Sequence, residues 1–302
     1  MAGVVLLAGG TGGAKLGRGL LDAGGPPVTV IANTGDDIEI YGAHVSPDPD
    51  LCAYWLADRI DARGWGVRGD TFAVMDGLRE LGEDVWFRLG DRDLAVCLHR
   101  ARRLAEGARL TEALAELTAA LRIPARVLPM SDDPVRTRVK ARGAWHGFQQ
   151  FMIRERAAGP VEDVEFAGAA GATPPPEALD ALAEAEAIVI GPSNPVASIG
   201  PILAVPGLRE AIAAAPAPVL AVSPIVGGAV LKGPTAAFLE WAGQPASAAG
   251  IAAMYAGLID GIVADDDPGG SLPALRTETR LDEEIARAIV AGEILEFAAS
   301  LR

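Results

Sequence analysis

The chain has 302 residues, 50% of them hydrophobic, enough to bury the core of one large domain or of a domain with a subdomain. Its formal net charge of −14 argues against general attraction to nucleic acid or to an anionic membrane. The 2 cysteines and 3 histidines form no cluster with zinc spacing, and no apolar run reaches the roughly 20 residues of a membrane helix, so we expect a soluble cytoplasmic protein.

The N-terminal segment alternates strand, glycine turn, helix and strand. Val4–Leu7 and Val28–Ala32 are short apolar runs typical of buried strands, and Ala14–Ala23 has the length and composition of a helix. This βαβ opening predicts a parallel sheet.

The glycine turn between the first strand and helix reads GGTGGAK over residues 9–15. It is neither a Walker A loop nor a strict G-x-G-x-x-G sequence, because Lys15 is not followed by Ser or Thr and stands at the third glycine position. Bare backbone N–H groups at a helix start nevertheless favour a phosphate, so we expect Gly10, Thr11, Gly12 and Gly13 to hold one together with Lys15. A tight turn without a ligand is the alternative.

Four carboxylates follow within 15 residues. Asp36 and Asp37 lie in the turn after the second strand, and Asp48 and Asp50 lie in a turn where the helix expected over Asp50–Ile60 begins. Carboxylates beside a phosphate site favour magnesium, which binds a few acidic side chains together with water and substrate phosphates. Helix capping and turn formation remain open for each single Asp, and for Asp50 above all.

A second acidic turn, Gly90 to Asp93, comes after a strand expected over Val85–Leu89. Arg92 in this turn either contacts a phosphate or pairs with the neighbouring acids. Helices are expected at Leu94–Ala105 and Leu110–Leu121.

The middle of the chain changes character. Ala125–Pro129 and Arg136–Arg142 have strand-like patterns, and residues 168–176 are rich in Gly, Ala and Pro. We interpret 125–170 as an inserted, strand-rich subdomain on a core formed by 1–124 and 171–302.

The α/β pattern then resumes with strands expected at Ala187–Ile190, Val219–Val222 and Gly261–Ala264, and with a closing helix at Asp282–Ala299. The predicted fold class is therefore α/β: a Rossmann-like, mostly parallel sheet with helices on both faces and a mixed α+β insertion.

The turn after the strand at 187–190 carries a candidate nucleotide contact. Ser193 and Asn194 stand between two prolines and offer donors and acceptors suited to a base or ribose edge. Lys232, later in the chain, is either a phosphate partner or an exposed lysine.

Together these segments resemble the 2-phospho-L-lactate transferases of coenzyme F420 biosynthesis, through nearly the whole chain. The resemblance rests on seven segments in the family's order: GGTGGAK (9–15), NTGDD (33–37), SPDPD (46–50), GDRD (90–93), MSDDPVRT (130–137), GPSNPVASIGPIL (191–203) and SPIVGGAVLKGP (223–234). One departure is that Pro49 and Leu51 stand where the family has Leu and Thr, which removes a hydroxyl.

The resemblance implies a magnesium-dependent reaction. A guanylyl diphosphate carrying lactate, enolpyruvate or glycerate on its outer phosphate reacts with the ribityl hydroxyl of 7,8-didemethyl-8-hydroxy-5-deazariboflavin, and GMP leaves. The family relationship also implies a homodimer.

The resemblance also implies roles for single residues. Asp36 and Asp50 would be catalytic and would bind the metal, with Asp50 close to the attacking hydroxyl. The diphosphate would lie on the backbone of 10–13 and on Lys15, and the guanosine on Ser193 and Asn194. The remaining expected contacts, on the deazaflavin side, are those of Arg88, Asp91 and Arg92.

Two other function classes are weighed against the transferase. A related family of gluconeogenesis factors shares the glycine opening and the Asp pair but acts as a non-catalytic, nucleotide-sugar-binding regulator; the segments at 90–93 and 130–137 favour the transferase. A nicotinamide-dependent oxidoreductase is disfavoured, because Asp36 and Asp37 fall in a turn rather than forming a lone acid at the strand end.

Overall fold

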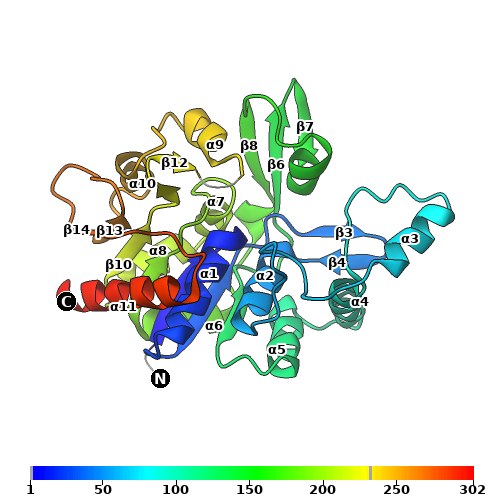
Figure 1. The fold of residues 1–302 in the computed structure, drawn as a ribbon, viewed down its shortest axis with the longest axis horizontal. Helices are drawn as coiled ribbons and strands as arrows, with labels where there is room; N and C mark the ends of the chain where they lie inside the picture. The colour runs from blue at the N-terminus through cyan, green and yellow to red at the C-terminus, as the bar shows by residue number, and fades with distance from the viewer. Residues whose placement is uncertain (1–2, 231–232) are drawn as a thin grey trace.

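A seven-stranded parallel sheet forms the centre of the protein in a computed structural model that describes residues 3–230 and 233–302; Lys232 lies outside these residues. The strands follow one another across the sheet in the order β14-β13-β10-β9-β1-β2-β5. Figure 1 shows β14, β13 and β10 on the left of the view. Their bounds are β1 Gly3–Ala8, β2 Val28–Ala32, β5 Arg126–Pro129, β9 Ala185–Ile190, β10 Val219–Val222, β13 Gly261–Ala264 and β14 Ala274–Arg276. The predicted fold class is confirmed.

The strand order reverses between β1 and β9. From β1 the chain builds outward through β2 to β5, then returns to the other side of β1 and builds outward again through β9, β10, β13 and β14. The carboxyl ends of β1 and β9 therefore flank a topological switch point, where open α/β sheets bind their ligands. Gly191 N–H donates to Leu7 O at 2.9 Å, so the turn after β9 lies beside the glycine turn after β1.

The central strands bury side chains on both faces. In β1, Val4 and Leu6 pack into one core and Val5 and Leu7 into the other, because successive side chains of a strand point to opposite faces. This two-sided burial explains the nearly continuous apolar runs of the sequence. One face is covered by α1 Gly10–Asp22, α2 Pro47–Leu56 and α11 Glu284–Ser300.

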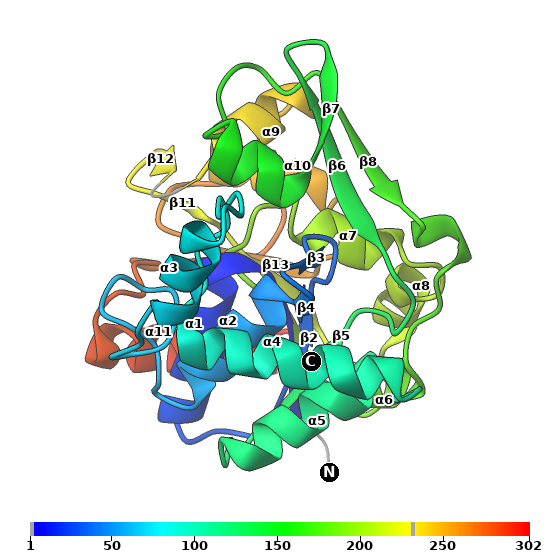
Figure 2. The same cartoon turned by 90° about the vertical axis from the view of Figure 1, so that its right-hand side faces the viewer.

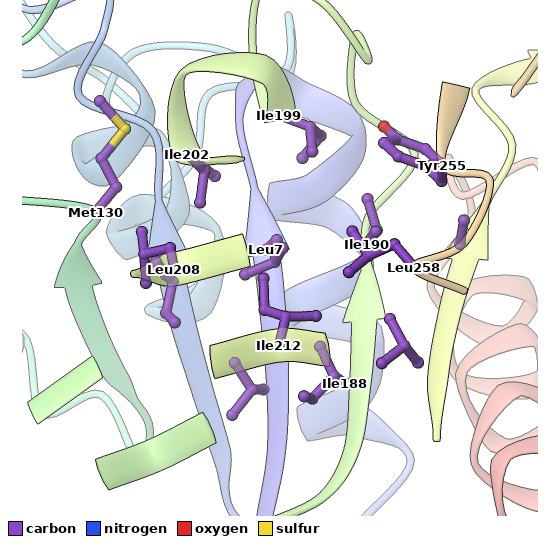
Figure 3. Packing of buried hydrophobic residues seen from close by; sticks show 14 of the residues in the cluster. Leu7, Met130, Ile188, Ile190, Ile199, Ile202, Leu208, Ile212, Tyr255 and Leu258 are labelled. Atoms are coloured by element: carbon purple, nitrogen blue, oxygen red, sulfur yellow. The ribbon is translucent and has the colours of Figure 1, made fainter. Parts of the chain in front are cut away.

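The opposite face carries the larger hydrophobic core. Figure 3 shows Leu7 and Ile190 of the sheet facing Ile199, Ile202 and the helices beyond them. The covering helices are α6 Pro176–Ala183, α7 Ile199–Ala204, α8 Leu208–Ala214, α9 Thr235–Trp241 and α10 Ala248–Met254.

Two smaller units stand beyond the carboxyl ends of the strands. One joins the hairpin of β3 and β4 to the two helices α3 and α4 on the right of Figure 1, and the other is the antiparallel sheet β7-β6-β8 at the top of the same view. Helix α5 lies lower in that view and packs against β5. Figure 2 shows that this second sheet rises well away from α4 and α5. Their bounds are β3 Ile38–Ile40, β4 Ala43–Val45, α3 Ala73–Glu80, α4 Asp91–Ala105, α5 Leu110–Ala120, β6 Arg136–Ala141, β7 Ala144–Gly147 and β8 Asp163–Ala167.

Short elements complete the description. A π-helix at Gln150–Arg154 follows β7, and a 3-10 turn at Ala169–Gly171 follows β8. The hairpin of β11 Ile225–Val226 and β12 Ala229–Val230 comes after β10. β5, which the predicted boundaries assign to the insertion, pairs with β2 as the edge strand of the main sheet.

Two local predictions were wrong. The helix expected at Asp50–Ile60 is α2 at Pro47–Leu56, because Pro49 and Pro47 fit its first turn, and Asp50 lies within that turn rather than capping it. The strand expected at Val85–Leu89 is irregular chain: Phe87 and Leu89 are buried in a small core with Met75 and Cys97, and no strand in the described part of the chain pairs with them. Within residues 3–230 and 233–302, none of the helices combines the length and the apolar character needed to cross a membrane.

Candidate active site

A cavity of about 610 Å3 opens at the switch point, over the glycine turn. We call it the glycine-turn cavity. Its walls include six of the seven residues predicted to bind the nucleotide and its phosphates: Gly10, Thr11, Gly12, Lys15, Ser193 and Asn194. The structure therefore brings together two turns that lie more than 180 residues apart in the sequence.

The first turn of α1 presents open donors to this cavity. Among the described residues, no hydrogen bond to a group outside the helix occupies the backbone N–H groups of Thr11 or Gly12. Such N–H groups at a helix start carry partial positive charge and suit a phosphate. Packing also requires glycine at position 12, because a Cβ there would lie 2.1 Å from Pro192 O.

Two predicted phosphate contacts are arranged differently from the expectation. The N–H of Gly10 donates to Asp48 Oδ1 at 2.6 Å, so a carboxylate already caps the helix there. Gly13 lies outside the cavity wall, and a Cβ on it would come within 2.8 Å of Ala8 Cβ and Ser193 Oγ. Lys15 reaches the cavity while its Nζ pairs with Asp282 at 2.5 Å.

A second cavity, of about 460 Å3, lies between α2, α4 and the chain before α4. We call it the aromatic cavity, because five aromatic side chains line it: Tyr54, Trp65, Phe72, Trp86 and Phe87. Asp50, Asp70, Arg88 and Asp93 line it as well. A flat ring with a polyol chain fits such a mixture of aromatic and polar groups.

Only some of the predicted deazaflavin contacts lie on the wall of this cavity. Arg88 lines it, with its guanidinium 4.0 Å from the centre of the Phe72 ring. Asp91 instead accepts hydrogen bonds from the N–H groups of Ala73 and Val74 at the start of α3. Arg92 is exposed and donates to Arg68 O at 3.3 Å. The structure therefore brings Arg88 and Asp50 together and leaves Asp91 and Arg92 outside the cavity wall.

The two cavities meet at Asp48 and Trp65, which line both. Asp48 lies at the start of α2, and its Oδ2 accepts a hydrogen bond from Asn33 Nδ2 at 2.9 Å. The sequence had placed Asp48 in the acidic cluster without a role of its own. Its position on both walls depends on the crossing of α1 and α2, which no local pattern reveals.

The acidic cluster is buried. Asp36, Asp37, Asp48 and Asp50 are each at most 6% exposed. Burial, with the nearby charges of Asp48 and Asp37, raises the pKa of Asp36 well above its usual range. Burial raises the pKa of Asp48 to about 6, although the hydrogen bonds from Asn33 and Gly10 favour its charged form.

The basic groups next to this cluster carry less positive charge than the four carboxylates carry negative charge. Arg100 pairs with Asp50, and His44 Nε2 lies 3.0 Å from Asp37 Oδ2. Asp36 contacts the neutral amides of Asn33 and Gln149.

The carboxylate oxygens of the cluster are a donor type that small divalent cations take. Among the described residues, however, the three ligand atoms that lie within 4.8 Å of one another are those of Asp50, Asp93 and Cys97. Asp50 Oδ2 is buried without a hydrogen-bond partner among the described residues. Hard carboxylate oxygens in excess over basic groups are the donors that Mg2+ prefers. Asp36 faces the glycine-turn cavity, Asp50 faces the aromatic cavity, and Asp48 lies on both walls.

Comparisons with known proteins agree with this geometry. The family described as 2-phospho-L-lactate transferase CofD matches residues 4–287. The chain belongs to this family. It is thereby a transferase of coenzyme F420 biosynthesis.

Two relatives in this family carry different substrate names. A phosphoenolpyruvate transferase of Kitasatospora aureofaciens is 42% identical over 95% of this chain and 97% of its own length. A 2-phospho-L-lactate transferase of Methanosarcina mazei is 39% identical over 87% of both chains.

Among solved structures, a Bacillus halodurans protein has a similar fold, with a TM-score of 0.57 and 21% identity over 87% of this chain and 79% of its own.

Proposed function

We propose that this protein transfers a phospho-carboxylic acid unit from a guanylyl diphosphate donor to the terminal ribityl hydroxyl of 7,8-didemethyl-8-hydroxy-5-deazariboflavin. The unit is 2-phospholactate, phosphoenolpyruvate or 3-phosphoglycerate, and GMP is released. The observation that carries the proposal is the pair of adjoining cavities: open helix N–H groups line one, aromatic rings line the other, and Asp48 lies on both walls.

In this proposal the donor occupies the glycine-turn cavity. The backbone N–H groups of Thr11 and Gly12 hold the diphosphate, with Lys15 beside them. Ser193 and Asn194 hold the guanosine side. Gly10 supports the turn by taking a positive φ of 64°, a conformation that other residues rarely adopt.

The acceptor ring occupies the aromatic cavity, with Arg88 and Phe72 on its wall and the ribityl chain directed toward Asp50. Asp50 Oδ2 orients the terminal hydroxyl and takes its proton. The hydroxyl oxygen then forms a bond to the outer phosphorus. The bond from that phosphorus to the bridging oxygen breaks, and this oxygen leaves as part of GMP. Asp91 and Arg92 act by shaping the α3–α4 region rather than by touching the ring.

Asp36 and Asp50, with Asp48 between the cavities, would hold Mg2+. When bound, this ion supplies positive charge to the diphosphate oxygens and stabilises the charge that develops on GMP. The chain's own contribution is to place the two substrates in line across the Asp48 boundary.

The test is to mix the protein with the deazaflavin precursor, Mg2+ and each of the three guanylyl donors, and to follow GMP and the new phosphodiester. We expect both products in equal amounts with at least one donor, and their loss when Mg2+ is chelated. If neither product forms with any donor, the transferase assignment is refuted and the non-catalytic, nucleotide-sugar-binding regulator becomes the better description. We also propose a homodimer in the cytoplasm, and sedimentation of the purified protein tests the dimer.

A further inference from the structure

The segment after β7 contributes side chains to the walls of both cavities. Residues 148 and 149 are helical and run directly into the π-helix Gln150–Arg154. Phe148 and Met152 line the glycine-turn cavity, whereas Gln149 and Ile153 line the aromatic cavity. Because residues four apart in a helix share a face, this single turn presents one pair of side chains to each cavity.

This turn is tied to the acidic cluster. Gln149 Nε2 donates to Asp36 Oδ2 at 3.1 Å, which fixes the start of the turn over the site. Behind it, the ring of Phe151 packs edge-on against Phe238, with ring centres 6.2 Å apart. The wider π-helical turn is confirmed by the hydrogen bond from Glu155 N–H to Gln150 O at 3.1 Å. Such turns occur frequently at functional sites.

The chemistry of the proposed reaction places the three-carbon acid at this wall, so the inference rests on the proposed function. The outer phosphorus must lie within bonding reach of the ribityl hydroxyl and therefore at the boundary marked by Asp48 and Trp65. The acid is esterified to that phosphorus. As part of the donor, it lies on the glycine-turn side of the boundary, which is the side that Phe148 and Met152 line.

We propose that Met152, with Phe148 beside it, determines which three-carbon acid the enzyme accepts. All three acids carry a carboxylate, so that group cannot distinguish them. They differ in a methyl, a methylene or a hydroxyl-bearing carbon, which are differences that an apolar wall distinguishes by shape and polarity. The Met152 thioether is partly buried and apolar, and its flexible chain adapts to small changes of shape.

The test compares kcat/KM for the three donors in matched variants. Met152→Ala enlarges the wall on the donor side and admits water, so we expect kcat/KM for the glycerate donor to rise about tenfold relative to the lactate and enolpyruvate donors. Phe148→Leu should shift the same ratio in the same direction, and it serves if Met152→Ala folds poorly. Thermal unfolding of each variant checks the fold.

Ile153→Ala is the matched control, because the neighbouring side chain faces the acceptor. It should raise the KM for the deazaflavin precursor and leave the donor ratio within about twofold of the wild-type value. Trp145→Ala, on β7 of the same insertion and outside both cavity walls, should change neither quantity.

The outcomes separate two failures. GMP release with donor ratios unchanged in folded Met152→Ala and Phe148→Leu overturns the role of this wall alone. A donor ratio that shifts equally in Ile153→Ala also overturns it. If the wild-type protein releases no GMP with any donor, the proposed function itself is refuted, and the specificity role with it.

Discussion

The ion pair between Arg100 and Asp50 offers the sharpest test of how the site is held together. Arg100 lies on α4 and is 2% exposed. Its Nη2 donates to Asp50 Oδ1, and its Nη1 donates to His44 O at 2.9 Å. The guanidinium therefore links the first turn of α2 to β4 and compensates a carboxylate that is itself 3% exposed.

Arg100→Met should lower the free energy of unfolding by about 3–5 kcal/mol, the usual cost of leaving one buried charge without its partner. Part of that loss comes from the His44 carbonyl, whose hydrogen bond is worth about 1 kcal/mol. Adding Asp50→Asn to Arg100→Met should recover some of the lost stability, since the uncompensated charge is then gone. Urea unfolding followed by far-UV circular dichroism at neutral pH measures all three proteins.

Arg103→Met is the control on the same helix. Arg103 pairs with Glu106 and Glu116 near the surface, where water screens the charges, so its loss should cost much less than that of Arg100. A cost below about 1 kcal/mol for Arg100→Met would refute the reasoning. So would a double variant with Asp50→Asn whose loss equals the sum of the two single losses, because the two charges would then act independently.

Three further predictions concern packing, pH and turnover. Gly12→Ala should destabilise the protein by about 1–3 kcal/mol, since the new Cβ would lie 2.1 Å from Pro192 O, whereas Gly77→Ala, with nothing within 4 Å, should be neutral or slightly stabilising in thermal unfolding. Burial and the charge of Asp50 raise the pKa of Asp93 to about 7, so the folded protein keeps a proton that the unfolded chain loses near pH 4. Stability from this group therefore falls as pH rises from about 4 to 7, and urea midpoints of Asp93→Asn should fall less over that range than those of the wild type. Asp50→Asn should abolish GMP release with an unchanged far-UV spectrum; turnover near the wild-type rate would remove Asp50 from the mechanism.

The main sheet was predictable because its information is local. Val28–Ala32, Val219–Val222 and Gly261–Ala264 are apolar runs bounded by turn residues, and the structure has strands with these bounds. Because these strands are buried on both faces, their sequences are continuously apolar and are readily assigned as strands.

Segments outside the sheet were harder to predict. Val85, Phe87 and Leu89 alternate as in a strand, yet they bury apolar surface in a small core, and no strand among the described residues pairs with them. The start of α2 was misplaced by three residues because Pro47 is a good first helical residue, whereas Asp50 is an equally good cap.

The candidate site was predictable to the extent that strand ends carry it. Gly10, Thr11, Gly12, Ser193 and Asn194 follow β1 and β9, and the parallel sheet places both ends at one edge. No comparable rule predicts the site residues that come from the insertion or from the contact between α2 and α4.

Asp93 and Gln149 illustrate that limit. Asp93 accepts a hydrogen bond from Tyr54 Oη at 2.9 Å, across a contact between two helices about 40 residues apart in the chain. Gln149 reaches Asp36 from the segment that follows β7 of the inserted sheet.

The carboxylate of Asp48 at the start of α1 has a consequence for selectivity. This carboxylate accepts a hydrogen bond from the Gly10 N–H, so the helix end attracts free inorganic anions less strongly than an open one would. An incoming diphosphate brings more negative charge to a place that is already negative, and a divalent cation offsets that repulsion. Affinity for the donor and affinity for the cation should therefore increase together, as reciprocal linkage requires, and bare phosphate should compete poorly with the nucleotide.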